Sequence, residues 1–194
     1  SPTADIQVIV PTRIGAVGAN NLNQSLQERL NPPAPNKGEF ESNGRKFRVG
    51  DKVMQIKNNY DILWQKDNGE EGMGVYNGDI GFIESIDRPT KTLLIRFDDR
   101  VAEYLFEMAP ELELAYAITV HKSQGSEFEA VVMPLTSYKS KMHYRNLLYT
   151  AVTRAKSRLI LLGQEKTIAE MIANNRKTVR YTNLKEMLLG QVEE

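Results

Sequence analysis

Apolar positions follow different periods in different parts of the chain. The first part begins with an apolar run at residues 6–10, which is typical of a buried strand, and continues through a turn-rich loop. Residues 21–30 then predict a short helix, because one stripe of leucines recurs four positions apart, at Leu22, Leu26 and Leu30. Prolines directly after this segment end the helix, since proline cannot donate to the helical hydrogen-bond ladder.

Between residues 47 and 110 the pattern changes to short β segments separated by turn residues such as Asn77 and Gly78. We expect strands at residues 52–57, 78–86, 92–97 and 101–106. Four or five short strands in roughly 60 residues, with no helical pattern among them, are typical of a small closed barrel.

Helix and strand patterns alternate again after Leu112. Strands of the buried type are expected at residues 129–135 and 158–162, and residues 144–156 repeat apolar positions at the helical period. The segment 115–123 is compatible with a strand, because its large apolar residues alternate, or with a helix, because of its alanines.

The simplest architecture is an α/β layer interrupted by a small β domain. The α/β layer comprises residues 1–46 and 111–194, and the interrupting barrel comprises residues 47–110. The tail after Gln164 contains further helical patterns, near Ile168 and Leu184. The chain enters its first strand almost at once, so we expect it to be an excised fragment of a longer protein.

Composition narrows the functional classes. Lys and Arg number 25 and Asp and Glu number 25, so any nucleic-acid-binding face has to be local. The absence of cysteine excludes disulfides and thiolate chemistry, and two histidines argue against a metal site. No apolar run approaches the roughly 20 residues of a membrane span, and no signal segment stands at the start. We therefore expect a cytoplasmic protein without membrane contact.

One stretch concentrates positive charge, because no acidic residue occurs between Glu129 and Glu165. Its basic residues are Lys139, Lys141, Arg145, Arg154, Lys156 and Arg158. On the predicted helix over 144–156, Arg154 lies along one border of the apolar stripe and Tyr149 along the other. An ordinary amphipathic helix with solvated basic residues explains the same pattern.

Hydrogen-bond donors gather between residues 119 and 124, just before Gly125. Donors at the end of an element, followed by a glycine that allows close approach of the backbone, suit the binding of phosphates or a sugar. A polar loop that caps a helix is the alternative for this segment.

Two stretches resemble motifs of one family. Residues 119–128, Thr-Val-His-Lys-Ser-Gln-Gly-Ser-Glu-Phe, resemble the fifth conserved motif of superfamily 1 helicases, and residues 147–156, Leu-Leu-Tyr-Thr-Ala-Val-Thr-Arg-Ala-Lys, resemble the sixth. The His-Lys-Ser-Gln-Gly variant and the opening segment 10–32 are similar to the RecD-like branch. Residues 47–109 resemble the SH3-like domain inserted in the second motor domain of that branch.

This resemblance implies a RecA-like second motor domain, of the P-loop NTPase type but lacking the phosphate loop, with an inserted SH3-like barrel. In the family, ATP binds between two RecA-like domains, and the first supplies the phosphate loop and the Mg²⁺-binding acid. The chain contains no Gly-x-x-x-x-Gly-Lys-Ser/Thr sequence. We therefore expect ATP and Mg²⁺ to act in the full-length enzyme, with the Mg²⁺ ligands elsewhere, and this fragment to be inactive alone.

The resemblance also assigns roles to individual residues. The arginines expected at the γ-phosphate are Arg154 and Arg13. The residues expected to bind the nucleotide are Gly125, Glu127, Gln124 and Tyr149. The residues expected to contact the backbone of single-stranded DNA are Thr119, His121, Lys122 and Ser123. No residue is expected to bind a metal.

The implied activity is ATP-driven 5′ to 3′ translocation on single-stranded DNA and duplex unwinding, together with the missing N-terminal RecA-like domain. The barrel offers Lys52, Lys57 and Arg96 to phosphates, or it docks a protein partner. Tyr60 and Trp64 either stack on a base or cover the core of the barrel. Two other classes stay open, the helicase region of a conjugative relaxase and a non-catalytic module that binds DNA or protein.

Overall fold

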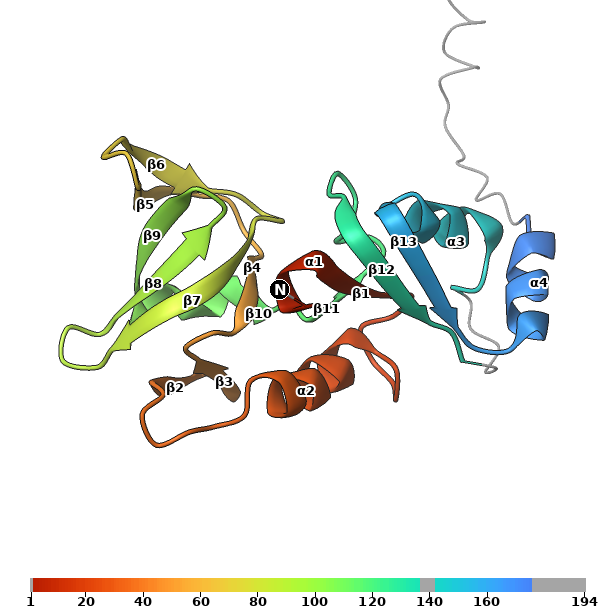
Figure 1. The fold of residues 1–194 in the computed structure, drawn as a ribbon, viewed down its shortest axis with the longest axis horizontal. Coiled ribbons are helices and arrows are strands. Elements are labelled where there is room, and N and C mark those ends of the chain that lie inside the picture. The colour runs from red at the N-terminus through yellow and green to blue at the C-terminus, as the bar shows by residue number, and fades with distance from the viewer. Residues whose placement is uncertain (1, 137–141, 176–194) are drawn as a thin grey trace, which may run out of the picture.

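The computed structural model describes residues 2–136 and 142–175, in which an α/β part and a β part lie side by side (Figure 1). The α/β part is built on four parallel strands in the order β11, β1, β12, β13. These strands are β1 (Ile6–Val10), β11 (Ala117–Thr119), β12 (Phe128–Pro134) and β13 (Ala155–Leu162). The helices are α1 (Pro2–Asp5), α2 (Ala19–Leu30), α3 (Arg145–Val152) and α4 (Glu165–Ala173). The expected mixed α/β layer is therefore present, and residues 117–119 of the ambiguous segment are a strand.

The β part is a seven-stranded antiparallel sheet in the order β10, β4, β7, β8, β9, β5, β6. Its strands are β4 (Lys52–Gln55), β5 (Asn59–Lys66), β6 (Glu71–Val75), β7 (Ile80–Asp87), β8 (Thr92–Phe97), β9 (Arg100–Leu105) and β10 (Leu112–Leu114). The four expected strands are found as β4, β7, β8 and β9, whereas β5, β6 and β10 were not expected. Within the described ranges, no pairing joins the outer strands β10 and β6, so the hydrogen bonds do not close a barrel.

The β part also extends further along the sequence than residue 110. The 3₁₀-helix η1 (Phe106–Glu111) spans that expected boundary, and β10 follows it and pairs with β4. The polypeptide thus leaves the α/β part before β4 and returns through β10, directly beside β4. The insertion lies between β1 and β11, which are neighbours in the parallel sheet.

Each part has its own hydrophobic core. The α/β core gathers buried residues of β1, β12 and α3, including Ile9, Val131 and Leu147. The core of the β part includes Ile95 and Tyr104.

Buried polar groups join the two parts. The carboxylate of Asp51 is fully buried and accepts hydrogen bonds from Gln27 at 2.6 Å, Asn31 at 2.6 Å and the hydroxyl of Tyr116 at 2.9 Å. Buried polar groups that keep their partners specify one arrangement of the elements around them. Asp51 therefore holds the start of β4 against α2 and against the segment that leads into β11.

Lys52 is also buried, which corrects its expected availability to phosphates. Its Nζ atom donates to the carbonyl oxygens of Thr3 at 3.0 Å and Ile6 at 3.3 Å. Burial lowers the pKa of Lys52 from 10.5 to about 8, and the nearby charge of Asp5 opposes this shift. Lys52 thus ties β4 to the start of β1.

The leucine stripe of α2 is not its buried face. The buried residues of this helix are Ala19, Asn23 and Gln27, and Leu30 is 51% exposed. The side chain of Asn23 bonds to both backbone groups of Ala117, with two distances of 2.8 Å. The two amides face inward because Asn23 satisfies backbone groups of β11, and Gln27 donates to the carbonyl oxygen of Lys46 and to the carboxylate of Asp51, groups that need partners when buried.

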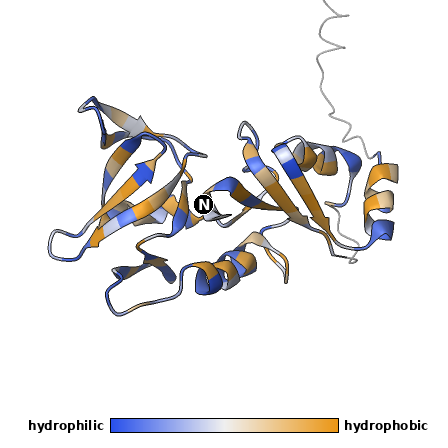
Figure 2. Ribbon diagram, viewed as in Figure 1, coloured by the Kyte–Doolittle hydropathy of each residue, from blue (hydrophilic) through white to orange (hydrophobic). Residues whose placement is uncertain are grey.

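The predicted helix over residues 144–156 is shorter in the structure. α3 ends at Val152, and Ala155 already belongs to β13. β13 is also not a buried strand, since Ile160 is 49% exposed and Leu162 is 53% exposed. Figure 2 shows the hydrophobic character of β12 and β13. β13 is an outer strand, so in the described part of the chain its apolar side chains lack a neighbouring strand on one side.

A separate hairpin follows α2 and was not expected. It consists of β2 (Glu39–Ser42) and β3 (Arg45–Arg48), joined by Asn43 and Gly44 with φ of 51° and 71°. Two positive φ values in a two-residue turn are typical of a type I′ hairpin, for which Asn-Gly is a preferred sequence.

The predicted helix near Ile168 is observed as α4, whereas the one near Leu184 lies outside the described residues, as do Lys139 and Lys141. Within the described ranges, no helix is long and apolar enough to cross a membrane.

Candidate functional site

The first group of candidate residues follows the carboxyl ends of β1 and β11. Val10 and Thr119 are register partners, and the amide of Val120 donates to the carbonyl oxygen of Val10 at 3.0 Å. The parallel arrangement brings the loop with Arg13 next to the segment with Lys122. Loops at the carboxyl ends of parallel strands are common binding positions in α/β sheets.

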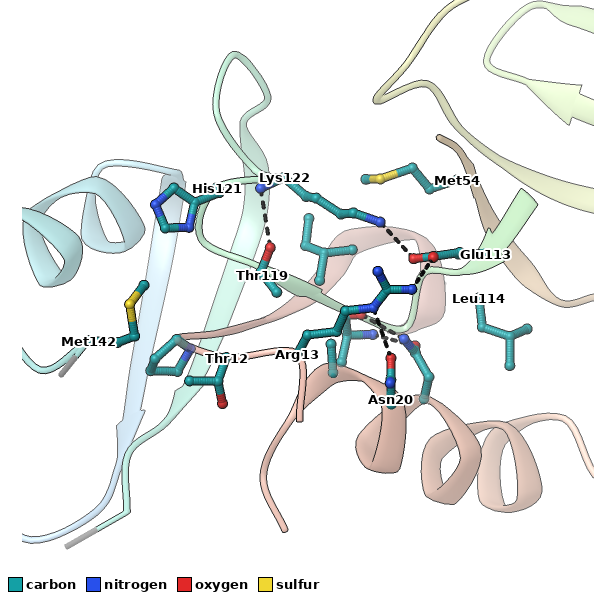
Figure 3. A pocket seen from close by; sticks show the side chains of 15 residues that line it. Thr12, Arg13, Asn20, Met54, Glu113, Leu114, Thr119, His121, Lys122 and Met142 are labelled. Carbon is teal, nitrogen blue, oxygen red and sulfur yellow. Dashed lines mark hydrogen bonds and ion pairs between the residues drawn. The ribbon is translucent and has the colours of Figure 1, made fainter. Parts of the chain in front are cut away.

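Glu113 connects these two loops (Figure 3). One of its carboxylate oxygens lies 2.5 Å from Nη2 of Arg13 and 3.3 Å from Nη2 of Arg45, and the other lies 2.6 Å from Nζ of Lys122. Burial raises the pKa of Glu113, but the hydrogen bond and charge of Lys122 and the charges of Arg13 and Arg45 outweigh it, so the pKa is lowered. One carboxylate thus serves three cations, which leaves the cluster with a net positive charge.

A groove of about 350 Å³ lies beside this cluster. Its polar lining includes Arg13, Thr119, His121 and Lys122, and its apolar lining includes Met54. His121 is exposed and Lys122 is half-buried. Cations at the rim of a groove suit the phosphodiester backbone of a nucleic acid.

Ser123 does not line this groove, although it was expected to contact DNA. It is fully buried, and its hydroxyl donates to the carbonyl oxygen of Val120 at 2.8 Å. The hydroxyl of Thr119 accepts from the amide of Lys122 at 3.4 Å. Ser123 therefore stabilises the turn that positions Lys122, since a fully buried hydroxyl cannot reach a strand in solvent.

The second group of candidates precedes the amino ends of β12 and β13. The guanidinium of Arg154 donates to the carbonyl oxygens of Ser126 at 3.1 Å and Thr150 at 3.3 Å, and to the hydroxyl of Thr153 at 3.3 Å. Arg154 forms no ion pair with the described residues, while a guanidinium has five N–H donors. Its charge is therefore held in place by neutral acceptors and stays available to an anion.

The expected nucleotide-binding residues surround this arginine unevenly. Gly125 has φ of +86°, a conformation that favours glycine, and no atom lies where its Cβ would stand. Gln124 and Glu127 are exposed in the same loop, and Tyr149 on α3 is 69% exposed. An anionic phosphate fits the free charge of Arg154, and a ribose hydroxyl fits the exposed carboxylate of Glu127.

Arg13 does not meet Arg154, although both were expected at the γ-phosphate. Arg13 follows the carboxyl end of β1, whereas Arg154 precedes the amino end of β13. β1 and β13 are parallel strands separated by β12, so the two arginines lie toward opposite ends of the strands. Arg13 instead lies with the residues expected to contact DNA.

Two features of this surface were missed in the sequence. Glu113 gives no signal of its own, because its three partners come from distant positions. The β2–β3 hairpin did give a signal, since Asn43-Gly44 stands between two short segments that each carry one phenylalanine among polar residues, Phe40 and Phe47.

Comparison with known families assigns most of the chain. Residues 22–97 match the family described as the ATP-dependent RecD-like DNA helicase SH3 domain. Residues 114–162 match the family described as the UvrD-like helicase C-terminal domain. The second match contains both Lys122 and Arg154.

Curated relatives agree with these matches. The ATP-dependent RecD2 DNA helicase of Deinococcus radiodurans is 33% identical over 183 residues, which cover 94% of this chain and 23% of the relative. The RecBCD enzyme subunit RecD of Mycolicibacterium smegmatis is 28% identical over 176 residues, covering 91% of this chain and 28% of that subunit. The chain thus spans less than a third of the length of these relatives.

Solved structures share the fold. The Pif1 helicase from Bacteroides in complex with ADP-AlF3 and ssDNA has a TM-score of 0.54 and 17% identity, covering all of this chain and 47% of that one. Pif1 helicase from Candida albicans has a TM-score of 0.53 and 15% identity, covering 98% and 51%. The two family matches and the curated relatives agree: the chain is a C-terminal region of the RecD-like DNA helicase family.

Proposed function

We propose that this chain is the C-terminal motor region of an ATP-dependent DNA helicase and works with a RecA-like domain that carries the phosphate loop. In this proposal, ATP and Mg²⁺ bind between the two domains, and the Mg²⁺ ligands belong to the other domain. The chain alone does not hydrolyse ATP, because it lacks the sequence that cradles the phosphates.

Arg154 is the arginine finger in this proposal. When bound, ATP supplies the phosphoryl group that is transferred to water, and Arg154 stabilises negative charge on it. Support comes from the three neutral acceptors that orient its guanidinium and from its lack of an ion pair in the described part of the chain. Glu127 accepts from a ribose hydroxyl, Tyr149 packs against the nucleotide, and Gly125 and Gln124 shape the loop between them.

Single-stranded DNA binds at the other group of residues. Lys122 and Arg13 contact phosphates, and Thr119 and His121 complete the groove wall. Arg13 therefore has a DNA-binding role in this proposal, because it pairs beside Lys122 rather than near Arg154.

The segment from Val120 to Glu127 carries the proposal, because it joins the two sites in a single short connection. It begins beside Lys122 and ends beside the acceptor of Arg154, Ser126. The amide of Ser126 donates to the carbonyl oxygen of the buried Ser123 at 3.1 Å. A displacement of Ser126 at the nucleotide is therefore transmitted to Lys122 through the short segment 120–127, which the buried Ser123 holds in place.

We infer further that the seven-stranded part is the SH3-like insertion expected at residues 47–110, extended by β10 to Leu114, within the motor domain expected at 1–46 and 111–194. Translocation runs from 5′ to 3′, and the partner is single-stranded DNA, with a protein partner docking on the insertion. The match of residues 22–97 to the RecD-like helicase SH3 domain supports the first assignment, and the direction and the partners are proposed from the resemblance to RecD-like helicases.

The test joins this chain to a RecA-like domain that carries the phosphate loop of a RecD-like helicase and measures DNA-stimulated ATP hydrolysis. Replacing Arg154 with Ala should lower the rate on the order of 10³- to 10⁵-fold, the range known for arginine fingers. The control is Arg158→Ala, an exposed arginine on β13, which should leave the rate unchanged. Equal rates for wild type and Arg154→Ala would favour the non-catalytic binding module.

A further inference from the structure

A second groove adjoins the groove beside Lys122. It has a volume of about 450 Å³ and runs between α2 and the β2–β3 hairpin. The two grooves share four lining residues, Asn20, Asn23, Glu113 and Leu114. They therefore form one continuous depression that passes from the parallel sheet to the hairpin.

The second groove has a cationic wall. Arg45 and Lys46 line it from β3. Both are accessible, since the side chain of Arg45 is 38% exposed and Lys46 is exposed. Glu28 lines the opposite side. Arg48 also lines the groove, but its charge is compensated by Glu39 at 2.5 Å. Arg45 shares the single carboxylate of Glu113 with two other cations, and Lys46 forms no ion pair among the described residues, so these two cations remain for a ligand.

The floor of the groove consists of amides. Asn20, Asn23, Gln24 and Gln27 stand at the i, i+3, i+4 and i+7 positions of α2, which is one face of a helix. Asn23 and Gln27 are buried in contacts with β11 and β3, whereas Asn20 and Gln24 are exposed. Exposed amides beside cations can bond to bases and sugars of any sequence while the cations hold phosphates.

The hairpin is held firmly enough to serve as a wall. Gln27 donates to the carbonyl oxygen of Lys46 at 2.9 Å, and the guanidinium of Arg45 donates to that of Leu112 at 3.0 Å. Phe40 stacks on Phe106 with ring centroids 4.4 Å apart. A fixed wall loses little conformational freedom when a ligand binds.

We infer that the groove between α2 and the β2–β3 hairpin extends the nucleic-acid track, with Arg45 and Lys46 holding backbone phosphates of a single strand beyond those at Lys122 and Arg13. Glu113 lies where the two grooves meet and positions a cation of each, Lys122 and Arg45. This inference rests on the proposed function and adds a second stretch of contacts to it.

Fluorescence anisotropy of labelled oligothymidylates of roughly 6 and 16 nucleotides, within the site sizes of single-strand-binding folds, tests the inference. The measurement uses the whole chain and a series of salt concentrations. Replacing both Arg45 and Lys46 with Ala should remove most of the advantage of the longer oligonucleotide. It should also lower the salt slope by about 1.4, or about 0.7 for each phosphate contact with a single strand.

The control is Lys166→Ala, an exposed lysine on α4, which lies at one end of the molecule and away from the hairpin (Figure 1). This change should leave both quantities unchanged. Lys46→Glu, a change at an exposed position, should reproduce the loss without disturbing Arg45. If Lys122→Ala weakens binding but the hairpin variants do not, the inference is wrong and the proposed function stands. If no variant changes the binding, both are wrong.

Discussion

The Nζ atom of Lys122 lies 2.6 Å from a carboxylate oxygen of Glu113. The same carboxylate pairs with Arg13 and Arg45, so one acidic side chain occupies the point where three cations meet. A phosphate that binds there competes with Glu113 for these cations. The carboxylate thus limits the affinity of the surface for polyanions while it keeps the cations in place.

Replacing Glu113 with Gln should strengthen binding of single-stranded DNA. The amide keeps the shape and an acceptor oxygen but removes the negative charge that competes with phosphate. Anisotropy titrations at several salt concentrations should give a lower Kd at every salt concentration than for wild type. Glu103→Gln, at an exposed position on β9, is the control, and weaker binding of the Glu113 variant would contradict the competition.

Replacing Arg13 with Ala should weaken DNA binding and reduce the salt slope by about 0.7, the contribution of one phosphate contact with a single strand. In the chain joined to a phosphate-loop domain, the KM for ATP measured at saturating DNA should stay at its wild-type value, because Arg13 follows the carboxyl end of β1 whereas Arg154 precedes the amino end of β13. A raised KM for ATP with unchanged DNA binding would restore Arg13 to the γ-phosphate.

Replacing Ser123 with Ala should lower the free energy of unfolding by about 1 kcal/mol, since the carbonyl oxygen of Val120 loses a buried hydrogen bond. The salt slope of DNA binding should not change, because the hydroxyl is not accessible. Urea denaturation and anisotropy measure the two quantities. A reduced slope without a loss of stability would mean that Ser123 contacts the strand directly.

Replacing Tyr116 with Phe should lower the free energy of unfolding by about 1 to 3 kcal/mol, because the buried carboxylate of Asp51 loses one of its donors. The matched control is Tyr76→Phe, which removes a hydroxyl from a side chain that is 44% exposed. Urea denaturation of both variants gives the comparison. Equal losses would show that Asp51 does not depend on Tyr116.

Lys52 should make stability depend on pH in the alkaline range. Its pKa is about 8 in the folded chain, below the ordinary value of 10.5, so the unfolded chain binds more protons between these limits. Stability attributable to Lys52 therefore rises as the pH increases from about 8 to 10.5. Measured against Lys52→Met, the free energy of unfolding of the wild type should increase over this range, and a constant difference would contradict the buried position.

Local patterns were sufficient to predict much of the fold. The alternation of apolar residues located β7, β8 and β9, and the apolar run at the start located β1. Sequence reasoning went wrong at α2, where a leucine stripe suggested the buried face but Asn23 and Gln27 are buried instead. Their burial depends on backbone groups more than 90 positions away in the case of Asn23, and a local period cannot contain that information.

The candidate site was predicted unevenly for the same reason. Two residues of one motif, Thr119 and Lys122, were expected to act together, and both line one groove. Arg13 lines the groove with Lys122 rather than lying beside Arg154, and this placement depends on strand order and direction, which a local pattern does not contain. Periodicity also extended α3 into Ala155, whose apolar side chain fits a helix and a strand equally well.

The first and last strands of the inserted part, β4 and β10, are paired, and this pairing bears on the order of folding. Gln7 and Tyr116 are hydrogen-bonded although 109 positions separate them, so pairing β1 with β11 first would require closing a very long loop at a large entropic cost. Three of the six neighbouring pairs in the seven-stranded sheet are joined by short turns, namely β5–β6, β7–β8 and β8–β9, and β10 pairs with β4. We therefore expect the seven-stranded sheet to form first, because the pairing of β10 with β4 shortens the loop that closes when β11 pairs with β1.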